Sequence, residues 1–300
     1  MAAVPAGNDP ASEALFLPLA GGQLRLPADG RVLFLRARDG FRLRETAKPG
    51  WLCQQSFKPF AEALARSGLR VGEPGADEHF DLVPVLPPRQ RDEARAVFAR
   101  AVRHALPGGI VLAAMTNVEG AKSGEADLRR LAGPVQVLSK HKSRVFWTAP
   151  LAADAVDPAL LAEWAALDAP REIAGGYTSR PGLFAWDRVD AGSALLAAHL
   201  PDDLHGRIAD LGAGYGYLSA EVIARCPQVT ALDAYEAEAR ALEPARRNLA
   251  RAQQASGHEV DVAVYWHDVT AGLPQRYDAI VSNPPFHQGR ADLPELGRAF

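Results

Sequence analysis

The chain has 300 residues and a mass of 32.1 kDa, enough for two domains of ordinary size. With 48% hydrophobic and 23% charged residues it is neither disordered nor fibrous, and no apolar run is long enough to span a bilayer. A net charge of -3 argues against coating nucleic acid through bulk charge but allows a local basic patch. Two cysteines, Cys53 and Cys226, are too few for a disulfide framework or a structural zinc site, and the first ten residues show no secretory signal. We therefore expect a cytoplasmic protein that holds no metal.

The first 170 residues alternate between predicted strands and helices, which indicates an α/β domain. In chain order the patterns predict a strand at Arg31–Arg36, a helix at Gln55–Ser67, a strand at Phe80–Leu86, a helix at Asp92–Leu106, strands at Ile110–Met115, Val135–Leu138 and Val145–Thr148, and a short helix at Pro158–Leu167. Pro107-Gly108-Gly109 is interpreted as a stop between a helix and the next strand. We place the domain boundary at residue 170.

The second domain, residues 171–300, has the same rhythm. The predicted elements are a helix at Ala191–His199, a strand at Arg207–Leu211, a helix at Leu218–Cys226, a strand at Val229–Tyr235, a helix at Ala239–Gln254, and strands at Val260–Trp266 and Tyr277–Ser282. Strands joined by crossover helices predict a doubly wound, mostly parallel sheet.

A short internal repeat links the two halves. Phe80–Pro88 aligns without a gap on Tyr277–Pro285, matching an aromatic residue, an aspartate, an apolar strand and a double proline. Leu86 then stands where Asn283 stands in the second copy. We infer that the halves are duplicates and that the first has lost the polar side chain at its strand end.

A glycine-rich loop follows the first strand of the second domain and opens a helix, which is typical of a nucleotide-like ligand site. Gly212, Gly214 and Gly216 do not have the spacing of a pyrophosphate-binding loop, because the third glycine comes one residue early. The spacing fits S-adenosylmethionine better, and Asp210 at the strand end can face the ammonium group of that ligand.

Two further acidic residues are candidates for the remaining parts of the ligand. A ribose diol needs a carboxylate at the end of the next strand, and Glu236 is preferred over Asp233 because the following helix begins close behind it. Asp268 can accept from an adenine amino group, although a turn cap is the alternative for it.

The reacting end is predicted at Asn283-Pro284-Pro285-Phe286, which follows an apolar strand. An exocyclic amino group on a base becomes nucleophilic when two acceptors face its hydrogens, and the Asn283 side-chain oxygen and the Pro284 carbonyl can supply them. Pro285 helps to fix the backbone, and Phe286 offers a face on which a base can stack. Such a site works by positioning, so it requires neither a metal nor a strong base.

These two motifs together resemble the class I S-adenosylmethionine-dependent methyltransferases that act on amino nitrogens. Asn283 to His287 is similar to the branch that methylates guanine N2 in ribosomal RNA, and Pro181 to Phe184 with Asp190 and Gly192-Ser193 resembles the lead-in of the small-subunit RNA enzymes. The resemblance implies two tandem Rossmann-like methyltransferase domains. The first, degenerate domain would support folding and RNA recognition, and the second would bind S-adenosylmethionine.

The resemblance also implies a monomer whose partner is ribosomal RNA or the small ribosomal subunit. The family continues past this motif with a helix and three more strands, whereas the sequence ends at Phe300. We therefore expect a second sheet that is incomplete at its C-terminal end, and low activity for residues 1–300 compared with an extended form.

RNA binding is assigned to two basic stretches in the first domain, through Arg89, Arg91 and Arg95 in one and Lys140 and Lys142 in the other. A solvated helix face and a solvated loop are the alternatives for these stretches. Two other functions remain open: a methyltransferase acting on adenine N6 or on a protein glutamine amide, and a non-catalytic RNA-binding or assembly factor.

Overall fold

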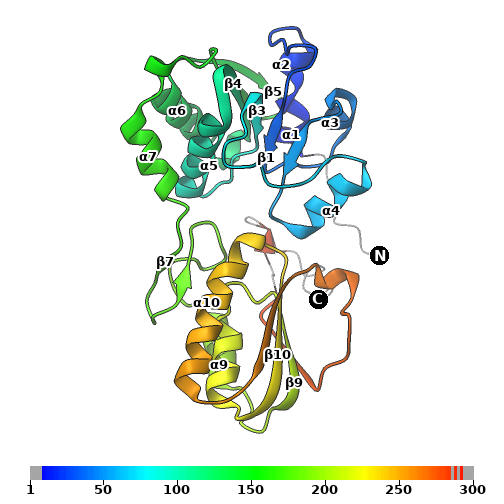
Figure 1. Cartoon of the computed structure of the whole chain (residues 1–300), viewed down its shortest axis with the longest axis vertical. Coiled ribbons are helices and arrows are strands. Elements are labelled where there is room, and N and C mark those ends of the chain that lie inside the picture. The colour runs from blue at the N-terminus through cyan, green and yellow to red at the C-terminus, as the bar shows by residue number, and fades with distance from the viewer. Residues whose placement is uncertain (1–8, 285–286, 289–290, 293–300) are drawn as a thin grey trace. The chain divides into compact units, whose positions relative to one another are not determined.

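The computed structural model describes residues 9–284, 287–288 and 291–292. The chain divides into two compact units, of which one ends at Ala169 and the other begins at Pro170 (Figure 1). Each unit has its own sheet and its own buried core. No helix in the described ranges is long and apolar enough to cross a membrane.

The first unit is built on a six-stranded sheet. Its strands are β1 (Leu33–Leu35), β2 (Leu52–Gln54), β3 (Phe80–Val85), β4 (Ala105–Thr116), β5 (Val135–Lys140) and β6 (Ser143–Thr148). They lie in the order β2-β1-β3-β4-β6-β5, and β6 runs antiparallel to both of its neighbours while the pairs from β2 to β4 are parallel. The prediction of a mostly parallel α/β sheet is confirmed.

Helices cover both faces of this sheet (Figure 1). They are α1 (Pro10–Leu15), α2 (Leu17–Ala20), α3 (Phe41–Thr46), α4 (Lys58–Arg66), α5 (Arg91–His104), α6 (Ala121–Ala132) and α7 (Pro158–Ala166), with short 3-10 turns η1 (Asn117–Glu119) and η2 (Ala153–Ala155). On one face α5, α6 and α7 bury Phe98, Leu128 and Trp164 against the sheet. Apolar residues of α5 recur at every fourth position, Ala94, Phe98 and Val102, which gives the helix one buried stripe.

The strand predicted at Ile110–Met115 starts earlier than expected, so its predicted start is wrong. β4 begins at Ala105, directly after α5, and runs through the segment interpreted as a stop. Four residues of β4, 106–109, stand opposite Asp81 alone on β3, because Ala105 pairs with Phe80 and Ile110 pairs with Leu82, so the strand bulges there. Gly109 is required in this bulge, because a Cβ atom on it would lie 2.9 Å from the Leu106 carbonyl oxygen.

The second unit is built on a four-stranded sheet within the described residues. The strands of this main sheet are β9 (His205–Leu211), β10 (Gln228–Glu236), β11 (Asp261–Trp266) and β12 (Ala279–Ser282). Two small two-stranded sheets pair β7 (Arg171–Glu172) with β8 (Thr178–Ser179) and β13 (His287–Gln288) with β14 (Ala291–Asp292). The helices are α8 (Ala191–Ala198), α9 (Tyr217–Arg225) and α10 (Ala239–Ser256), with the 3-10 turn η3 (Val269–Ala271). The main sheet has the order β11-β10-β9-β12 and is parallel throughout. α9 and α10 lie side by side on one face of it (Figure 1).

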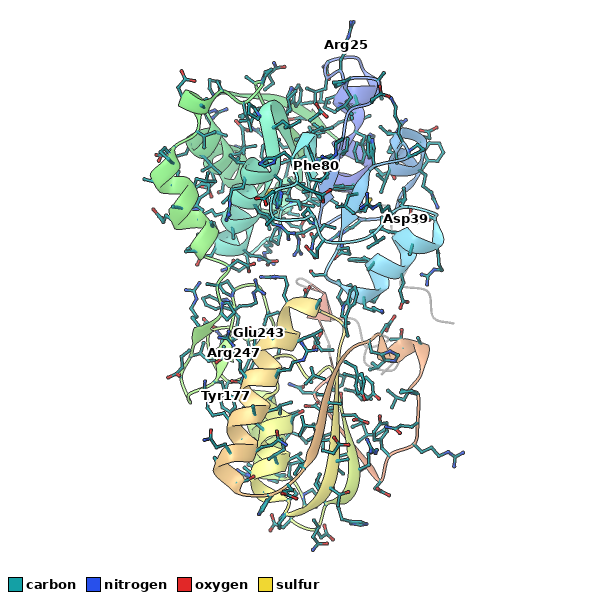
Figure 2. All side chains as sticks on the ribbon, viewed as in Figure 1. Arg25, Asp39, Phe80, Tyr177, Glu243 and Arg247 are labelled. Atoms are coloured by element: carbon teal, nitrogen blue, oxygen red, sulfur yellow. The ribbon has the colours of Figure 1, made fainter. Side chains whose placement is uncertain are left out.

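The two sheets have the same register around their first strands, which supports the predicted duplication. β3 lies beside β1 as β12 lies beside β9, and Leu35 pairs with Val85 where Leu211 pairs with Ser282. These pairs coincide when Phe80 is aligned on Tyr277. Phe80 is buried in the core of its unit (Figure 2).

The aligned aspartates make the same contacts in both units. Asp81 accepts from the Arg31 backbone N–H through its carboxylate at 2.8 Å and donates its own N–H to the Arg31 carbonyl. Asp278 makes the same pair of bonds with Arg207, again with a carboxylate contact of 2.8 Å. A chance match of nine residues would not explain why both aspartates make the same hydrogen bonds, whereas duplication of the unit would.

Candidate active site

The glycine loop links β9 to α9 and has the backbone that its sequence predicts. Gly212, Gly214 and Gly216 have φ values of 72°, 56° and 85°, a region that favours glycine. Gly212 also donates its N–H to the Tyr235 carbonyl at 2.9 Å, which holds the loop against the end of β10. Gly216 lets α9 approach α10, because a Cβ atom there would lie 3.4 Å from Ala245 Cα.

Asn248 on α10 fixes the outer side of this loop. The buried amide donates to the Tyr215 carbonyl at 2.7 Å and to the Thr178 carbonyl at 2.8 Å, and its oxygen accepts from the Thr178 N–H. Tyr177 on the neighbouring hairpin donates its hydroxyl to Glu221 of α9 (Figure 2). The loop is therefore held by α10 and by the end of β10, and the neighbouring hairpin is held by α9.

Asp210 lies at the end of β9 and is almost fully buried. Its Oδ2 accepts from the Ser219 hydroxyl at 2.6 Å and from the Ser219 N–H at 3.1 Å, whereas its buried Oδ1 has no hydrogen-bond partner among the described residues. Burial raises the pKa of Asp210 to about 6, although the Ser219 bonds act in the opposite direction. An unpaired buried carboxylate oxygen is costly, so this atom calls for a donor or a cation.

Glu236 ends β10 and its carboxylate is held by the backbone. Oε2 accepts from the Gly214 N–H at 2.8 Å and Oε1 accepts from the Glu238 N–H at 2.7 Å. Burial raises the pKa of Glu236 above its ordinary value, and the two backbone bonds oppose that rise. A carboxylate has about four acceptor sites, so this group can still accept from a ligand hydroxyl.

The alternative acid, Asp233, is committed elsewhere in the fold. It is buried in the interior of β10, and its Oδ2 accepts from Tyr277 at 2.8 Å, from Gln275 at 2.7 Å and from Arg207 at 3.1 Å. These contacts leave Glu236 as the carboxylate beside the loop. Asp268 caps the turn η3, with Oδ1 accepting from the Thr270 N–H and hydroxyl, which is the cap considered as its alternative.

The predicted reacting end lies beside the glycine loop. The Ser282 hydroxyl donates to the Leu211 carbonyl at 2.9 Å, which ties the end of β12 to the end of β9. Asn283 follows directly, and its Nδ2 donates to Ser193 Oγ at 2.8 Å and to Asp190 Oδ2 at 3.1 Å. Pro284 is the next residue, and Pro285 and Phe286 lie outside the described residues.

One open pocket brings the two motifs together. It is lined by Phe184, Ala185, Asp190, Ser193, Asp210, Gly212, Ala213, Gly214, Tyr215, Tyr217, Leu218 and Asn283. Phe184 is 69% exposed at this pocket, although phenylalanine is usually buried. It precedes Ala185, which has a φ of 46° that is unusual for a residue with a side chain.

Sequence reasoning assigned no role to several of these lining residues. Asp190 and Ser193 belong to a stretch used only as a resemblance, yet they contact Asn283 directly. The available signal was an N-cap pattern, an aspartate three residues before a serine at the start of α8. That pattern locates a helix start, but it does not show which strand end faces it.

The first unit has different side chains at the positions equivalent to this site. Phe34 stands where Asp210 stands, is buried, and packs its ring against Phe16 at 5.5 Å. Leu86, also buried, stands where Asn283 stands. Apolar side chains therefore fill the positions of the acid and the amide.

Two of the three loop glycines and the second acid are replaced as well. Arg36 stands at the position of Gly212 and keeps a left-handed backbone with a φ of 55°. Gln55 stands at the position of Glu236, and its Nε2 donates to the Ala37 carbonyl at 2.6 Å. Arg38 stands at the position of Gly214, whereas Gly40 keeps the glycine found at Gly216. At the equivalent positions the first unit thus lacks both acids and two of the three loop glycines.

The two basic stretches of the first unit differ in how their charges are used. Arg91 and Arg95 both bind the carboxylate of Asp127 through two bonds each, at 3.0 to 3.1 Å. Burial raises the pKa of Asp127, but these hydrogen bonds outweigh it and hold the pKa below its ordinary value. This pairing favours a structural role for the two arginines.

Other cations of these stretches have no such partner. Arg89, Lys140 and Lys142 are exposed and form no ion pair with any residue that the structure describes. Lys142 and His141 form the turn between β5 and β6 with φ values of 56° and 52°. The described residues contain no group of three or more acidic, histidine or cysteine side chains that could hold a metal ion.

Comparison with known proteins links this site to one family. The model of the Methyltransferase small domain matches residues 176–300. The chain is 30% identical over 245 residues to the ribosomal RNA small subunit methyltransferase C of Shewanella amazonensis, covering 80% of this chain and 69% of that protein. It is 27% identical over 214 residues to the protein of the same name from Psychromonas ingrahamii, covering 70% of this chain and 59% of that protein. The chain thus spans roughly six tenths to seven tenths of the length of these two relatives.

A solved structure has the same fold. It is the 16S rRNA N2 G1207 methyltransferase of T. thermophilus in complex with AdoMet and guanosine, with a TM-score of 0.72 and 23% identity. The match covers 95% of this chain and 76% of that one. The prediction of two tandem α/β methyltransferase-like units is therefore confirmed.

Proposed function

The chain belongs to the ribosomal RNA small subunit methyltransferase C family, and from this premise we propose that it methylates the exocyclic N2 amino group of a guanine in small-subunit ribosomal RNA, with S-adenosylmethionine as the methyl donor. The observation that carries the proposal is that Asn283 and the glycine loop line the same pocket. One bound ligand could therefore contact the glycine loop while its reacting end faces the Asn283 amide.

Asp210 of the pocket and two acids that follow or end the neighbouring strands, Glu236 and Asp268, fit S-adenosylmethionine. The unpaired Oδ1 of Asp210 would accept from the ligand's ammonium group, and the free lone pairs of Glu236 would accept from the ribose hydroxyls. Asp268 keeps one carboxylate oxygen outside its turn cap, which is proposed to face the adenine amino group. When bound, the ligand would supply an electrophilic methyl group on a sulfonium.

Asn283 is proposed to orient the nucleophile. Its Oδ1 would accept one hydrogen of the guanine amino group and the Pro284 carbonyl would accept the other, which directs the nitrogen lone pair toward the methyl group. Pro285 and Phe286 are proposed to fix the loop and to stack on the base. Rate enhancement would come from orientation and from exclusion of water.

The rest of the proposal concerns the partner. The first unit is proposed to be a degenerate copy that supports folding and contacts RNA phosphates, while the second accepts a base that leaves its stack. We propose that the protein acts as a monomer in the cytoplasm.

Incubation of the chain with S-adenosylmethionine and small-subunit ribosomal RNA tests this function. After digestion to nucleosides, mass spectrometry is expected to find N2-methylguanosine. N6-methyladenosine, or a methylated glutamine in ribosomal protein, would identify a different acceptor. RNA binding without any affinity for S-adenosylmethionine would identify a non-catalytic assembly factor.

Affinity for S-adenosylmethionine is expected to rise about tenfold between pH 5 and pH 7. Burial raises the pKa of Asp210 to about 6 and raises that of Glu236 in the same direction. An ammonium group beside Oδ1 favours the carboxylate, so binding is strongest where Asp210 is already ionised. Calorimetry across this pH range measures the effect, and Asp210→Asn should flatten it.

In the ligand-free protein, ionisation of Asp210 lowers the free energy of unfolding as pH rises, whereas it raises the affinity for S-adenosylmethionine. Since the folded state keeps a proton on Asp210 that the unfolded state has lost, this group reduces stability as pH rises from about 4 to 6. The increase in Tm caused by S-adenosylmethionine should therefore be larger at pH 7 than at pH 5. An equal increase at both values would contradict the assigned role of Asp210.

Reversing the charge of Lys140 and Lys142 to glutamate is expected to weaken RNA binding about tenfold at 0.1 M salt and to reduce the salt slope by about 1 to 2. Arg89→Glu should have a smaller effect of the same kind. Filter binding at several salt concentrations measures both. Arg66→Glu, a charge reversal at an exposed position of α4, is the control. Unchanged RNA affinity in the lysine variant would favour the alternative interpretation, in which this stretch is only a solvated loop.

A further inference from the structure

The side-chain amide of Asn283 is held on one side only. Its Nδ2 carries two hydrogens, and it has two acceptors, Ser193 Oγ at 2.8 Å and Asp190 Oδ2 at 3.1 Å. Oδ1 makes no hydrogen bond with a described residue. Both donors of the amide are thus used by α8, and its acceptor is left for a ligand.

The chemistry of Asp190 determines which way round the amide lies. An ionised carboxylate only accepts, so a rotated amide would place Oδ1 against Asp190 Oδ2 and lose a hydrogen bond. Asp190 is itself fixed, because the same Oδ2 accepts from the Ser193 N–H at 2.9 Å as the N-cap of α8. Rotation of Asn283 is therefore opposed by a group that cannot follow it.

Two neighbours support this contact between Asn283 and α8. Ser282 ties the strand end to the Leu211 carbonyl, so the Asn283 backbone is anchored and rotation of the side chain is the main motion left. Gly192 lies beside the contact, and a Cβ atom there would come within 3.1 Å of Asp190 Oδ2. Glycine in the first turn of α8 gives the carboxylate room to reach the strand.

We propose that Asp190 and Ser193 are positioning residues that hold the Asn283 amide with its oxygen toward the amino group of the target base. This inference rests on the proposed function, because it assigns the orientation of the acceptor in that reaction. Neither residue needs to touch the base. Their effect on the reaction would pass through Asn283.

Removing the acceptors one at a time tests the inference. Ser193→Ala keeps the helix cap, since Asp190 bonds to the backbone N–H, and is expected to lower kcat about tenfold with KM for RNA unchanged. Asp190→Ser keeps a good N-cap residue but shortens the acceptor, with a similar expected loss. Ser193→Thr retains a hydroxyl and should restore most of the activity. Affinity for S-adenosylmethionine should stay within about twofold in all three variants.

Dependence on Asn283 separates positioning from a general structural role. In an Asn283→Ala background, Ser193→Ala is expected to cause no further loss of the residual activity. A further tenfold loss there, or a tenfold loss of cofactor affinity in Ser193→Ala alone, would overturn the inference. Asp157→Ser, which changes the aspartate cap of α7 in the first unit, is the matched control and should behave as wild type.

A spectroscopic measurement tests the orientation without turnover. The Asn283 side-chain NH2 resonances, identified by their loss in Asn283→Ala, should exchange slowly with water and speed up at least about fivefold in Ser193→Ala. Unchanged exchange would overturn the inference. If wild type forms no methylated guanosine while these resonances behave as expected, the proposed function fails and the amide contacts stand. If wild type methylates and Ser193→Ala equals it, the positioning role fails alone.

Discussion

Asn283→Ala is expected to lower methyl transfer by at least about a hundredfold and to leave the affinity for S-adenosylmethionine within about twofold of wild type. The amide supplies an acceptor for the reacting nitrogen and is not one of the groups proposed to bind the cofactor. Single-turnover assays with small-subunit ribosomal RNA measure the first quantity, and calorimetry measures the second.

Two further variants sharpen this experiment. Asn283→Asp keeps an acceptor but places a second carboxylate against Asp190, where the wild-type amide donates at 3.1 Å, so its activity should also be low. Asn117→Ala, an exposed asparagine of the first unit, is the control. Activity of Asn283→Ala within tenfold of wild type would show that the amide does not orient the nitrogen.

Glu236→Gln is expected to weaken S-adenosylmethionine binding about a hundredfold while the protein remains folded. The substituted amide would turn an N–H toward either the Gly214 N–H or the Glu238 N–H, both of which need an acceptor. It also loses the charge that would attract the ribose hydroxyls. Calorimetric titration gives the affinity, and thermal melting reports the fold.

The first unit offers the matched control for this variant. Gln55 occupies the equivalent position and turns its Nε2 to the Ala37 carbonyl, so Gln55→Ala should leave cofactor affinity unchanged. If Glu236→Gln binds within about threefold of wild type, the ribose is held by another group. Asp268 would then be the next carboxylate to test.

The regular elements could be predicted from the sequence because their patterns are long. α10 and β10 match the predicted helix and strand to within two residues at each end. β2, with three residues, is too short to show an alternating pattern, and α6 was missed because its glycine and serine residues weaken a helical pattern.

The site could be predicted only in part. The glycine loop and the strand end were visible as local motifs, and the structure brings them to one pocket. Contacts between distant segments were not visible: Asp190 lies 93 residues before Asn283, and Asp127 lies 36 residues after Arg91. The sequence alone therefore predicts an RNA-binding surface at Arg91 and Arg95, whereas the structure pairs both arginines with Asp127.

Arg36 indicates how much the two copies have diverged. Its φ of 55° reproduces the backbone of Gly212 at 72°, although an arginine is disfavoured there. The two later loop positions differ: Arg38 and Gly40 stand where Gly214 and Gly216 stand, and neither has a positive φ, Gly40 being extended with a φ of -176°. For protein engineering, rebuilding a ligand pocket in the first unit would therefore require a new main-chain path after Arg36 as well as new side chains.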